Sequence, residues 1–314
     1  MSRASSLYPI GDVLVRGENL DESNLYPIGY VPVSGENPDS ESTGSWSPVN
    51  PTQDSFLKKY FPGVRGALSM IKDEISGIVS RSADEINDFL ASRGFSMKLE
   101  PFGPDSIGFA SVLDLVVEWM TEGTRTLVRS VTSGRDFTAV RLTDGVRFCR
   151  SDNHTHPIAL IATKSGDLVA MTKLDSVPNG AFALEELAGQ LTRDAYQVFN
   201  EFGAVVFPMV NLDRDFDVSW LLGMELNGDP ITQAIGQVKL RMNAKGARAQ
   251  AAVAIVVTRS MPPRTFEDMV IDGQFLVWFI RPEFDSEQQY VPLFVAHVTE
   301  EDWADPGDLS VANG

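Results

Sequence analysis

The stretch from Gly246 to Pro263 constrains the fold of this chain more than any other segment. It reads GARAQAAVAIVVTRSMPP and ends in a double proline, which interrupts regular structure. In an extended conformation every second side chain faces the same way, and one face here is apolar, with small residues first. That face consists of Ala247, Ala249, Ala251, Val253, Ile255 and Val257. A strand with such a face can enter a sheet between two existing strands, although its composition alone favours an ordinary buried strand or an alanine-rich helix.

The regular elements of the chain are helical early and extended late, which predicts an α+β fold. Apolar residues at helical spacing predict helices over 68–78, 86–90 and 184–199, and a helix with an adjoining turn over 112–131. Ser82-Ala83-Asp84-Glu85 fits a capping box at the start of the second of these helices. Alternating patterns and buried apolar runs predict strands over 137–148, 204–210, 231–243, 275–281 and 292–298.

Four segments of the C-terminal third follow one another in a characteristic order. They read KGARAQAAV at 245–253, SMPP at 260–263, QFLVWFIR at 274–281 and PLFVAHV at 292–298. This order resembles the serpins, a family of serine-protease inhibitors with a hinge of the form KGTEAAAAT, a Ser-x-Pro-Pro element and strands like PFLFLIR and ilFmGrv. Weaker likenesses extend upstream, so that the resemblance covers roughly residues 102–306.

The resemblance implies a serpin-like α+β fold, with mixed and antiparallel sheets, helices packed on them and an exposed reactive-centre loop. It also implies a suicide-substrate mechanism in which the serine of a target protease attacks the loop and forms an acyl-enzyme. The freed hinge would then insert as a new strand between the strands near 138–148 and 231–243. Release of strain stored in the native fold would drive this insertion and distort the attached protease.

The same resemblance assigns the site residues. The hinge comprises Gly246, Ala247, Arg248, Ala249, Gln250, Ala251, Ala252 and Val253. Counting back from the double proline places the reactive bond between Arg259 and Ser260, whereas counting forward from Gly246 places it between Ser260 and Met261. We prefer the first, because Arg259 is the one distinctive side chain there and suits a trypsin-like serine protease as the partner.

Two other functions fit the sequence. A shortened body without a strained native state would make the chain a non-inhibitory serpin-fold interaction or structural module, and Arg248 does stand where the family hinge has glutamate. The second alternative is an unrelated α+β binding protein. No GxSxG, HExxH, phosphate-loop or dinucleotide motif is present, so we expect neither enzymatic activity nor a cofactor.

The first 54 residues are rich in Ser, Pro, Gly, Asn and acidic residues, which predicts a disordered acidic tail before a serpin-like domain at 55–307 and a C-terminal tail at 308–314. The tail contains a tandem repeat in which LYPIG at 7–11 recurs at 25–29, and VLVRGEN at 13–19 as VPVSGEN at 31–37. Either the repeat is a neutral duplication in a linker, or two docking peptides raise avidity for a partner. We favour docking, through Leu7, Tyr8, Ile10, Leu25, Tyr26 and Ile28.

Charge and cysteine content exclude several classes. The chain has 314 residues and a net charge of −17, which argues against binding to nucleic acid or to anionic membranes. Its single cysteine, Cys149, permits no intrachain disulfide. The N-terminus lacks an apolar segment of signal-peptide length, so we expect a cytoplasmic protein, with the extracellular space as the alternative that the family likeness implies.

One group of metal-ligand residue types stands out. Cys149, Asp152, His154 and His156 lie close in sequence and have the chemistry to bind zinc. A loop with scattered polar residues is the better interpretation, so no metal site is predicted. His297 lies in an apolar strand and is expected to be a hydrogen-bonded core or edge histidine.

Overall fold

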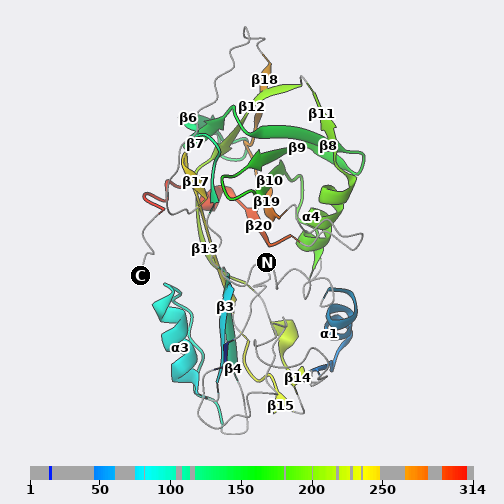
Figure 1. Cartoon of the computed structure of the whole chain (residues 1–314), viewed down its shortest axis with the longest axis vertical. Helices are drawn as coiled ribbons and strands as arrows, with labels where there is room; N and C mark the ends of the chain where they lie inside the picture. Colours follow the sequence, from blue (N-terminus) through cyan, green and yellow to red (C-terminus); the bar gives the residue numbers. More distant parts are fainter. Residues whose placement is uncertain are drawn as a thin grey trace.

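We describe the chain from a computed structural model. The residues described are 14–15, 46–60, 75–80, 82–103, 108–113, 117–179, 182–199, 201–216, 219–226, 229–234, 236–247, 266–281 and 292–309. Strands outnumber helices in these ranges and form mixed sheets, which confirms the α+β class. Figure 1 shows the larger sheets in its upper half and strands β3 and β4 beside helix α3 in its lower half.

A six-stranded antiparallel sheet has the order β11-β8-β9-β10-β19-β20. Its strands are β8 (Val146–Ser151), β9 (His154–Ala162), β10 (Leu168–Lys173), β11 (Tyr196–Val198), β19 (Phe275–Ile280) and β20 (Phe294–Val298). All six residues of β19 are buried, because successive side chains alternate between two covered faces. Helix α4 (Ala183–Asp194) covers the face that carries Trp278, whose indole N–H donates to Thr192 Oγ1 at 2.9 Å. The opposite face, with Phe275 and Val277, belongs to the main core.

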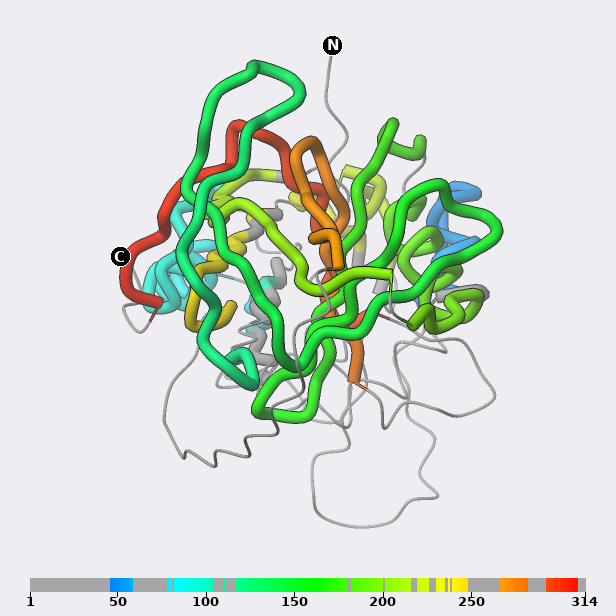
Figure 2. Tube along the Cα trace, turned by 90° about the horizontal axis from the view of Figure 1, so that it is seen from above, coloured from blue at the N-terminus to red at the C-terminus, as the bar shows by residue number. Residues whose placement is uncertain are grey.

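A second sheet has the order β18-β12-β7-β6. Its strands are β6 (Thr124–Arg129), β7 (Asp136–Leu142), β12 (Phe202–Pro208) and β18 (Glu267–Val270), the last parallel to β12. The C-terminal segment runs beside the β6–β7 hairpin, as Figure 2 shows from above. There Arg125 Nη1 lies 3.0 Å from Asp305 Oδ2, and Ser130 donates a hydrogen bond to Glu300.

Three smaller sheets complete the described part. One has the order β13-β16-β17-β5, one β1-β3-β4 and one β15-β14-β2. Their strands are β1 (Leu14–Val15), β2 (Trp46–Ser47), β3 (Ile75–Ser80), β4 (Gly108–Leu113), β5 (Val117–Glu118), β13 (Val210–Phe216), β14 (Glu225–Leu226), β15 (Asp229–Pro230), β16 (Gly236–Met242) and β17 (Gly246–Ala247). The remaining short elements are α1 (Pro51–Ser55), the π-helical turn η1 (Phe56–Tyr60) and the 3-10 turns η2 (Ser219–Leu221) and η4 (Glu300–Asp302).

Helix α3 (Ala83–Ser92) begins at the predicted cap. The Ser82 side chain accepts a hydrogen bond from the Glu85 backbone N–H at 3.4 Å, as a capping serine does. The Glu85 carboxylate does not return to the Ser82 N–H directly. Instead Ser80 donates to Glu85 at 2.5 Å and accepts from the Ser82 N–H at 2.9 Å, so that a second serine relays the capping box. Gly94, with φ of +78°, follows the helix end as predicted.

Two of the predicted helices are wrong. The range 112–131 contains the end of β4, strand β5 and strand β6, because it is rich in β-branched residues and its strands pair with β3, with β17 and with the hairpin partner β7. Of the predicted helix at 68–78, the described residues Ile75 and Ile78 lie on β3, paired with β4. Short apolar runs fit both periods, and pairing with partners elsewhere in the chain decides between them.

Two other elements are shorter than predicted. The predicted strand at 137–148 is two strands of different sheets, β7 up to Leu142 and β8 from Val146, separated by a turn with Gly145 at φ of +72°. The predicted helix at 184–199 ends at Asp194 in α4, and Tyr196–Val198 forms β11 on the edge of the six-stranded sheet.

The residues just before position 55 belong to the fold, contrary to the predicted tail. Asn50 caps α1 by accepting from the Gln53 N–H at 3.0 Å, and Pro51 opens the helix. The fully buried Gln53 side chain donates to the carbonyls of Trp220 and Leu222 at 2.8 and 3.0 Å. Local capping and one buried amide therefore order residues 46–54, which composition alone assigned to the tail.

A buried ion pair joins the start of β10 to the end of β19, and removing it is expected to lower the stability of the chain. Asp167 accepts from Arg281 Nε at 2.7 Å and Nη2 at 3.0 Å, with the side chains only 4% and 15% exposed. We expect Asp167→Asn to lower the free energy of unfolding by about 2 kcal/mol, because the buried guanidinium of Arg281 keeps its charge and loses the opposite charge of Asp167. Urea unfolding measures this loss. In the exposed pair Arg129–Asp136, Asp136→Asn should cost less than about 0.5 kcal/mol, and equal losses in both variants would contradict the expectation.

Candidate functional site at the base of the predicted loop

The first two residues of the predicted hinge lie inside a sheet. Strand β17 sits between β16 and β5, with Ala247 opposite Met242 on one side and opposite Val117 on the other. Both residues of β17 are buried. The chain enters this position from β16 through a tight turn at 243–245, so the base of the predicted loop is anchored at a defined place.

The turn between β16 and β17 is held by its own polar groups. The Asn243 N–H donates to Gly246 O at 2.9 Å, and the Lys245 N–H donates to Asn243 Oδ1 at 2.8 Å. The Asn243 amide also donates to Gly307 O at 3.0 Å, so the C-terminal segment is tied to the same turn. Asn243 is only 5% exposed, and an asparagine that satisfies several buried backbone groups fixes the turn conformation.

Trp119 forms the other wall of this site. Its side chain is 1% exposed, its indole N–H donates to Asn243 O at 2.9 Å, and its backbone N–H donates to Lys245 O at 3.1 Å. The ring packs edge-on against Phe207 at 6.1 Å between centroids. The sequence predicted Trp119 within a helix and gave it no role. A signal was present in the flanking β-branched residues and Gly123, which favour strands and a turn over a helix.

Gly246 is required by close packing, since a side chain has no room there. A Cβ at this position would lie 2.9 Å from Glu118 Cα and closer still to the Val117 carbonyl oxygen. Both contacts are backbone atoms of β5 and cannot rotate away. The glycine that the sequence marked as a flexible hinge therefore also permits two strands to meet.

Only one of the two strands that flank the hinge was predicted correctly. Strand β16 lies within the predicted range 231–243 and borders β17. The other predicted neighbour, 138–148, is wrong, because those residues belong to β7 and β8 of two different sheets. The second neighbour is β5. Its Glu118 forms an ion pair with Lys164, whose Nζ lies 2.5 Å from Glu118 Oε2. Because a helix was predicted over 112–131, β5 was not among the expected strands, although it is the neighbour of β17.

Several other predicted site residues lie outside the described residues. These are Arg248, Ala249, Gln250, Ala251, Ala252, Val253, Arg259 and Ser260 of the hinge and reactive bond, and Leu7, Tyr8, Ile10, Leu25, Tyr26 and Ile28 of the tail. They remain predictions.

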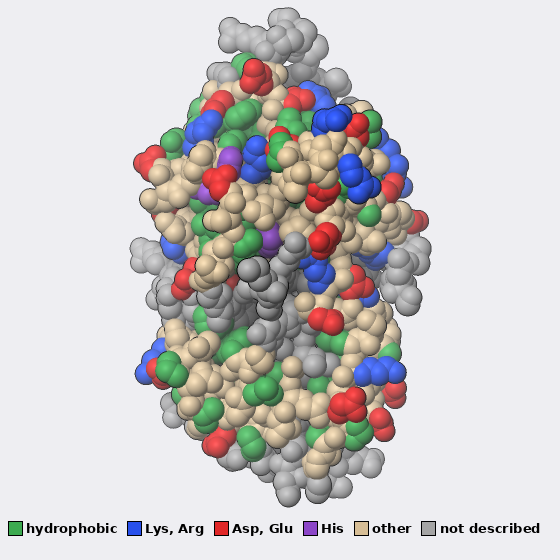
Figure 3. Space-filling model, turned by 180° about the vertical axis from the view of Figure 1, so that it is seen from behind, with side chains coloured by type: hydrophobic (Ala, Val, Ile, Leu, Met, Phe, Trp, Pro, Cys, Tyr) green, Lys and Arg blue, Asp and Glu red, His purple; other side chains and the backbone are tan. Residues whose placement is uncertain are grey.

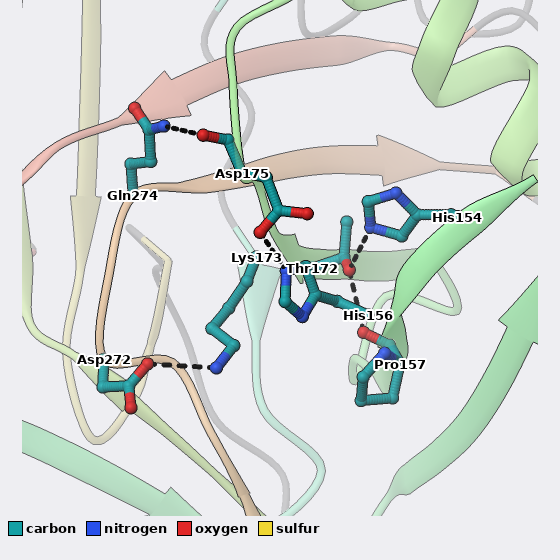
Figure 4. A network of polar contacts seen from close by, with 8 residues as sticks. All are labelled: His154, His156, Pro157, Thr172, Lys173, Asp175, Asp272 and Gln274. Atoms are coloured by element: carbon teal, nitrogen blue, oxygen red, sulfur yellow. Dashed lines mark hydrogen bonds and ion pairs between the residues drawn. The ribbon is translucent and has the colours of Figure 1, made fainter. Parts of the chain in front are cut away.

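The predicted polar loop around Cys149 is a β-hairpin. Cys149 is buried on β8, and burial raises the pKa of its thiol. His154 and His156 lie on β9, where the first shares a hydrogen bond with Thr172 Oγ1 at 2.9 Å and the second contacts Asp175 Oδ1 at 2.8 Å (Figure 4). Within the described residues no group of three or more His, Cys, Asp or Glu is placed to hold a metal ion.

His297 is a hydrogen-bonded core histidine, as predicted. It is 8% exposed, and its Nε2 lies 3.1 Å from Oε1 of Gln274, the residue before the neighbouring strand β19. Gln274 in turn donates to the Asp175 carbonyl, which connects this histidine with the network around His156 in Figure 4. Figure 3 shows the histidines in the upper half of one face, among interspersed acidic and basic side chains.

No protein-family model matches the chain, and no curated protein does. Solved structures do resemble it. A serpin from the trematode Schistosoma haematobium has 10% identity and a TM-score of 0.49 over 78% of this chain and 81% of its own. Serpin48 from the insect Tenebrio molitor has 12% identity and a TM-score of 0.45 over 69% of this chain. Human thyroxine-binding globulin has 10% identity and a TM-score of 0.49 over 79% of this chain.

The solved structures that the chain resembles are serpins. These low identities and TM-scores describe a likeness of fold alone. The chain spans 64% of the Tenebrio molitor serpin, less than two thirds of its length. The function of this chain therefore depends on the geometry and chemistry of its own residues. None of its described helices is long and apolar enough to span a bilayer.

Proposed function

We propose that this chain is an inhibitor of a trypsin-like serine protease that acts as a suicide substrate. The observation that carries the proposal is the position of Gly246–Ala247 between β16 and β5. Because the first two residues of the hinge already lie between two strands, the residues that follow can add to the sheet at the same place. The residues that follow, up to Val257, continue the small apolar face that a new strand needs.

The loop is anchored at both ends in different sheets. It leaves the first from β17 and reaches β18, which pairs in parallel with β12 in the second. Residues 248–265 join the two strands, and Arg259 lies in the second half of this segment. A cut after Arg259 would free a segment that stays attached to β17, so the freed end can pair along β16 while the acylated protease remains bound to it.

The first test is incubation with trypsin. We expect a covalent complex that survives denaturing gel electrophoresis and has the summed mass of trypsin and the chain up to Arg259, because insertion is faster than deacylation in such a mechanism. Mass spectrometry of the released C-terminal fragment should give Ser260 as its first residue. A fragment that begins at Met261 would support the alternative register of the reactive bond.

Two variants separate inhibition from simple cleavage. Arg259→Ala should abolish both the cut and the complex. Ala251→Arg places a charge on the face that must be buried, so we expect the cut to remain and the complex to fall at least tenfold. Clean cleavage of the unmodified chain without any complex would overturn the inhibitor proposal and favour the non-inhibitory module.

A further inference from the structure

Strand β3 has an edge that lacks the usual protection. Its residues, ISGIVS from Ile75 to Ser80, contain no charged side chain and no proline. Sheet edges in natural proteins are normally blocked by Lys, by Pro, by bulges or by a covering segment, because unpaired backbone groups invite another strand. One side of β3 is fully paired with β4, from Ile75 opposite Leu113 to Ser80 opposite Gly108. The other side therefore needs a covering segment.

The segment that covers this edge comes from the N-terminal repeat. Strand β1 pairs in parallel with β3, with Leu14 opposite Ile78 and Val15 opposite Val79. These two residues belong to the VLV of the first copy. β-Branched and aliphatic residues in this pattern favour an added strand, and backbone hydrogen bonds supply most of the binding in such an addition.

The second copy of the repeat differs from the first at a residue that pairs with β3. Leu14 corresponds to Pro32, so VLV becomes VPV. Proline has no N–H to donate to the neighbouring strand, and its ring fixes φ near −65°, away from the values of a parallel strand. The two copies are thus alike around LYPIG and unlike in the residues that pair.

We propose that the outer edge of β3 is a docking site for the first copy of the tail repeat, and that the second copy is excluded from it by Pro32. The occupant is a segment of this same chain, Leu14 and Val15 of strand β1. The second copy consequently keeps its LYPIG segment free of this site. The proposal does not depend on protease inhibition, because it concerns only the β1-β3-β4 sheet.

Hydrogen exchange of the full-length chain tests the docking. Leu14→Pro makes the first copy resemble the second, and we expect at least one β3 amide not bonded to β4 to exchange at least tenfold faster. Amides of β19 should keep their wild-type rates, which would show that the rest of the fold is intact. Unchanged exchange throughout β3 would overturn the proposal.

Peptides added to the Leu14→Pro chain test the selectivity. A peptide of residues 5–21 should restore the protection of β3, and a peptide of residues 23–39 should need at least tenfold higher concentration. The matched control is the 23–39 peptide with Pro32→Leu, which should protect as well as the first copy does. Equal protection by both natural peptides, or no protection by the 5–21 peptide, would contradict the proposed site.

Discussion

Gly246→Ala is expected to expel the hinge from its place between β16 and β5. The added methyl group would meet Glu118 Cα at 2.9 Å and the Val117 carbonyl even more closely, and neither backbone atom can move without breaking β5. We expect the free energy of unfolding to fall by about 3 kcal/mol, the upper range for inserting a methyl group into packed surroundings. Urea unfolding followed by circular dichroism measures this loss.

The same substitution should loosen the turn before β17. With β17 displaced, the hydrogen bonds from Trp119 to Lys245 and Asn243 are lost, so the peptide bond after Lys245 is no longer held in a fixed conformation. We therefore expect trypsin to cut after Lys245 at least tenfold faster than in the unmodified chain. Gly103→Ala is the matched control, because a Cβ there meets nothing within 4 Å, and it should change stability by less than about 0.5 kcal/mol. Similar behaviour of the two variants would show that β17 is not packed as described.

Glu185→Gln is expected to stabilise the chain, and more so as pH rises. Glu185 lies in the first turn of α4, and both its carboxyl oxygens are buried without a hydrogen-bond partner among the described residues. Burial raises the pKa of this carboxyl from 4.5 to about 8, with a smaller contribution from the neighbouring Glu186. The folded chain therefore favours the protonated form, whereas the unfolded chain ionises near pH 4.5.

The sign of the pH dependence follows from these two pKa values. Below pH 4.5 both states hold the proton and Glu185 has no pH-dependent effect. Between pH 4.5 and 8 the unfolded state has released its proton and the folded state has not, so stability falls as pH rises. At pH 7 the cost is about 3 kcal/mol, at about 1.4 kcal/mol for each pH unit above 4.5. Above pH 8 both states are ionised and the cost no longer grows.

Glutamine has nearly the same shape and no charge, so Glu185→Gln should recover most of this cost. Urea unfolding at pH 5.5, 7 and 8.5 should give a stability gain that increases along the series. Glu186→Gln is the control, because Glu186 is exposed in the same turn and should change stability by less than about 0.5 kcal/mol at each pH. A gain for Glu185→Gln that does not vary with pH would contradict a titrating buried carboxyl.

Local signals in the sequence predicted several elements correctly. The cap at Ser82, the strands β12, β16, β19 and β20, and the α+β class all follow from patterns within a few residues. Burial of every residue of β19 follows from its uninterrupted apolar run. The environment of His297 was also predicted, because a single histidine in an apolar strand normally has a hydrogen-bond partner.

The largest error has one physical cause. The segment at 112–131 has apolar residues that fit both helical and extended periods, and only its partners resolve the choice. Those partners are β3 and β17, which lie far away in the chain, and β7, which follows β6 in a hairpin. The same error concealed Trp119 and its hydrogen bond to Asn243, 124 positions away in sequence.

Residues 246–257 alone predict a strand that begins at Gly246 and has one small apolar face, because side-chain size and alternation are local properties. The tertiary structure alone decided which strands receive it, since β5 and β16 become neighbours only through pairing between distant parts of the chain. It also decided that Gly246 is needed for close contact, and that the tail's first repeat covers β3. Sheet neighbours are chosen by non-local hydrogen bonds and shared burial, which no short stretch of sequence encodes.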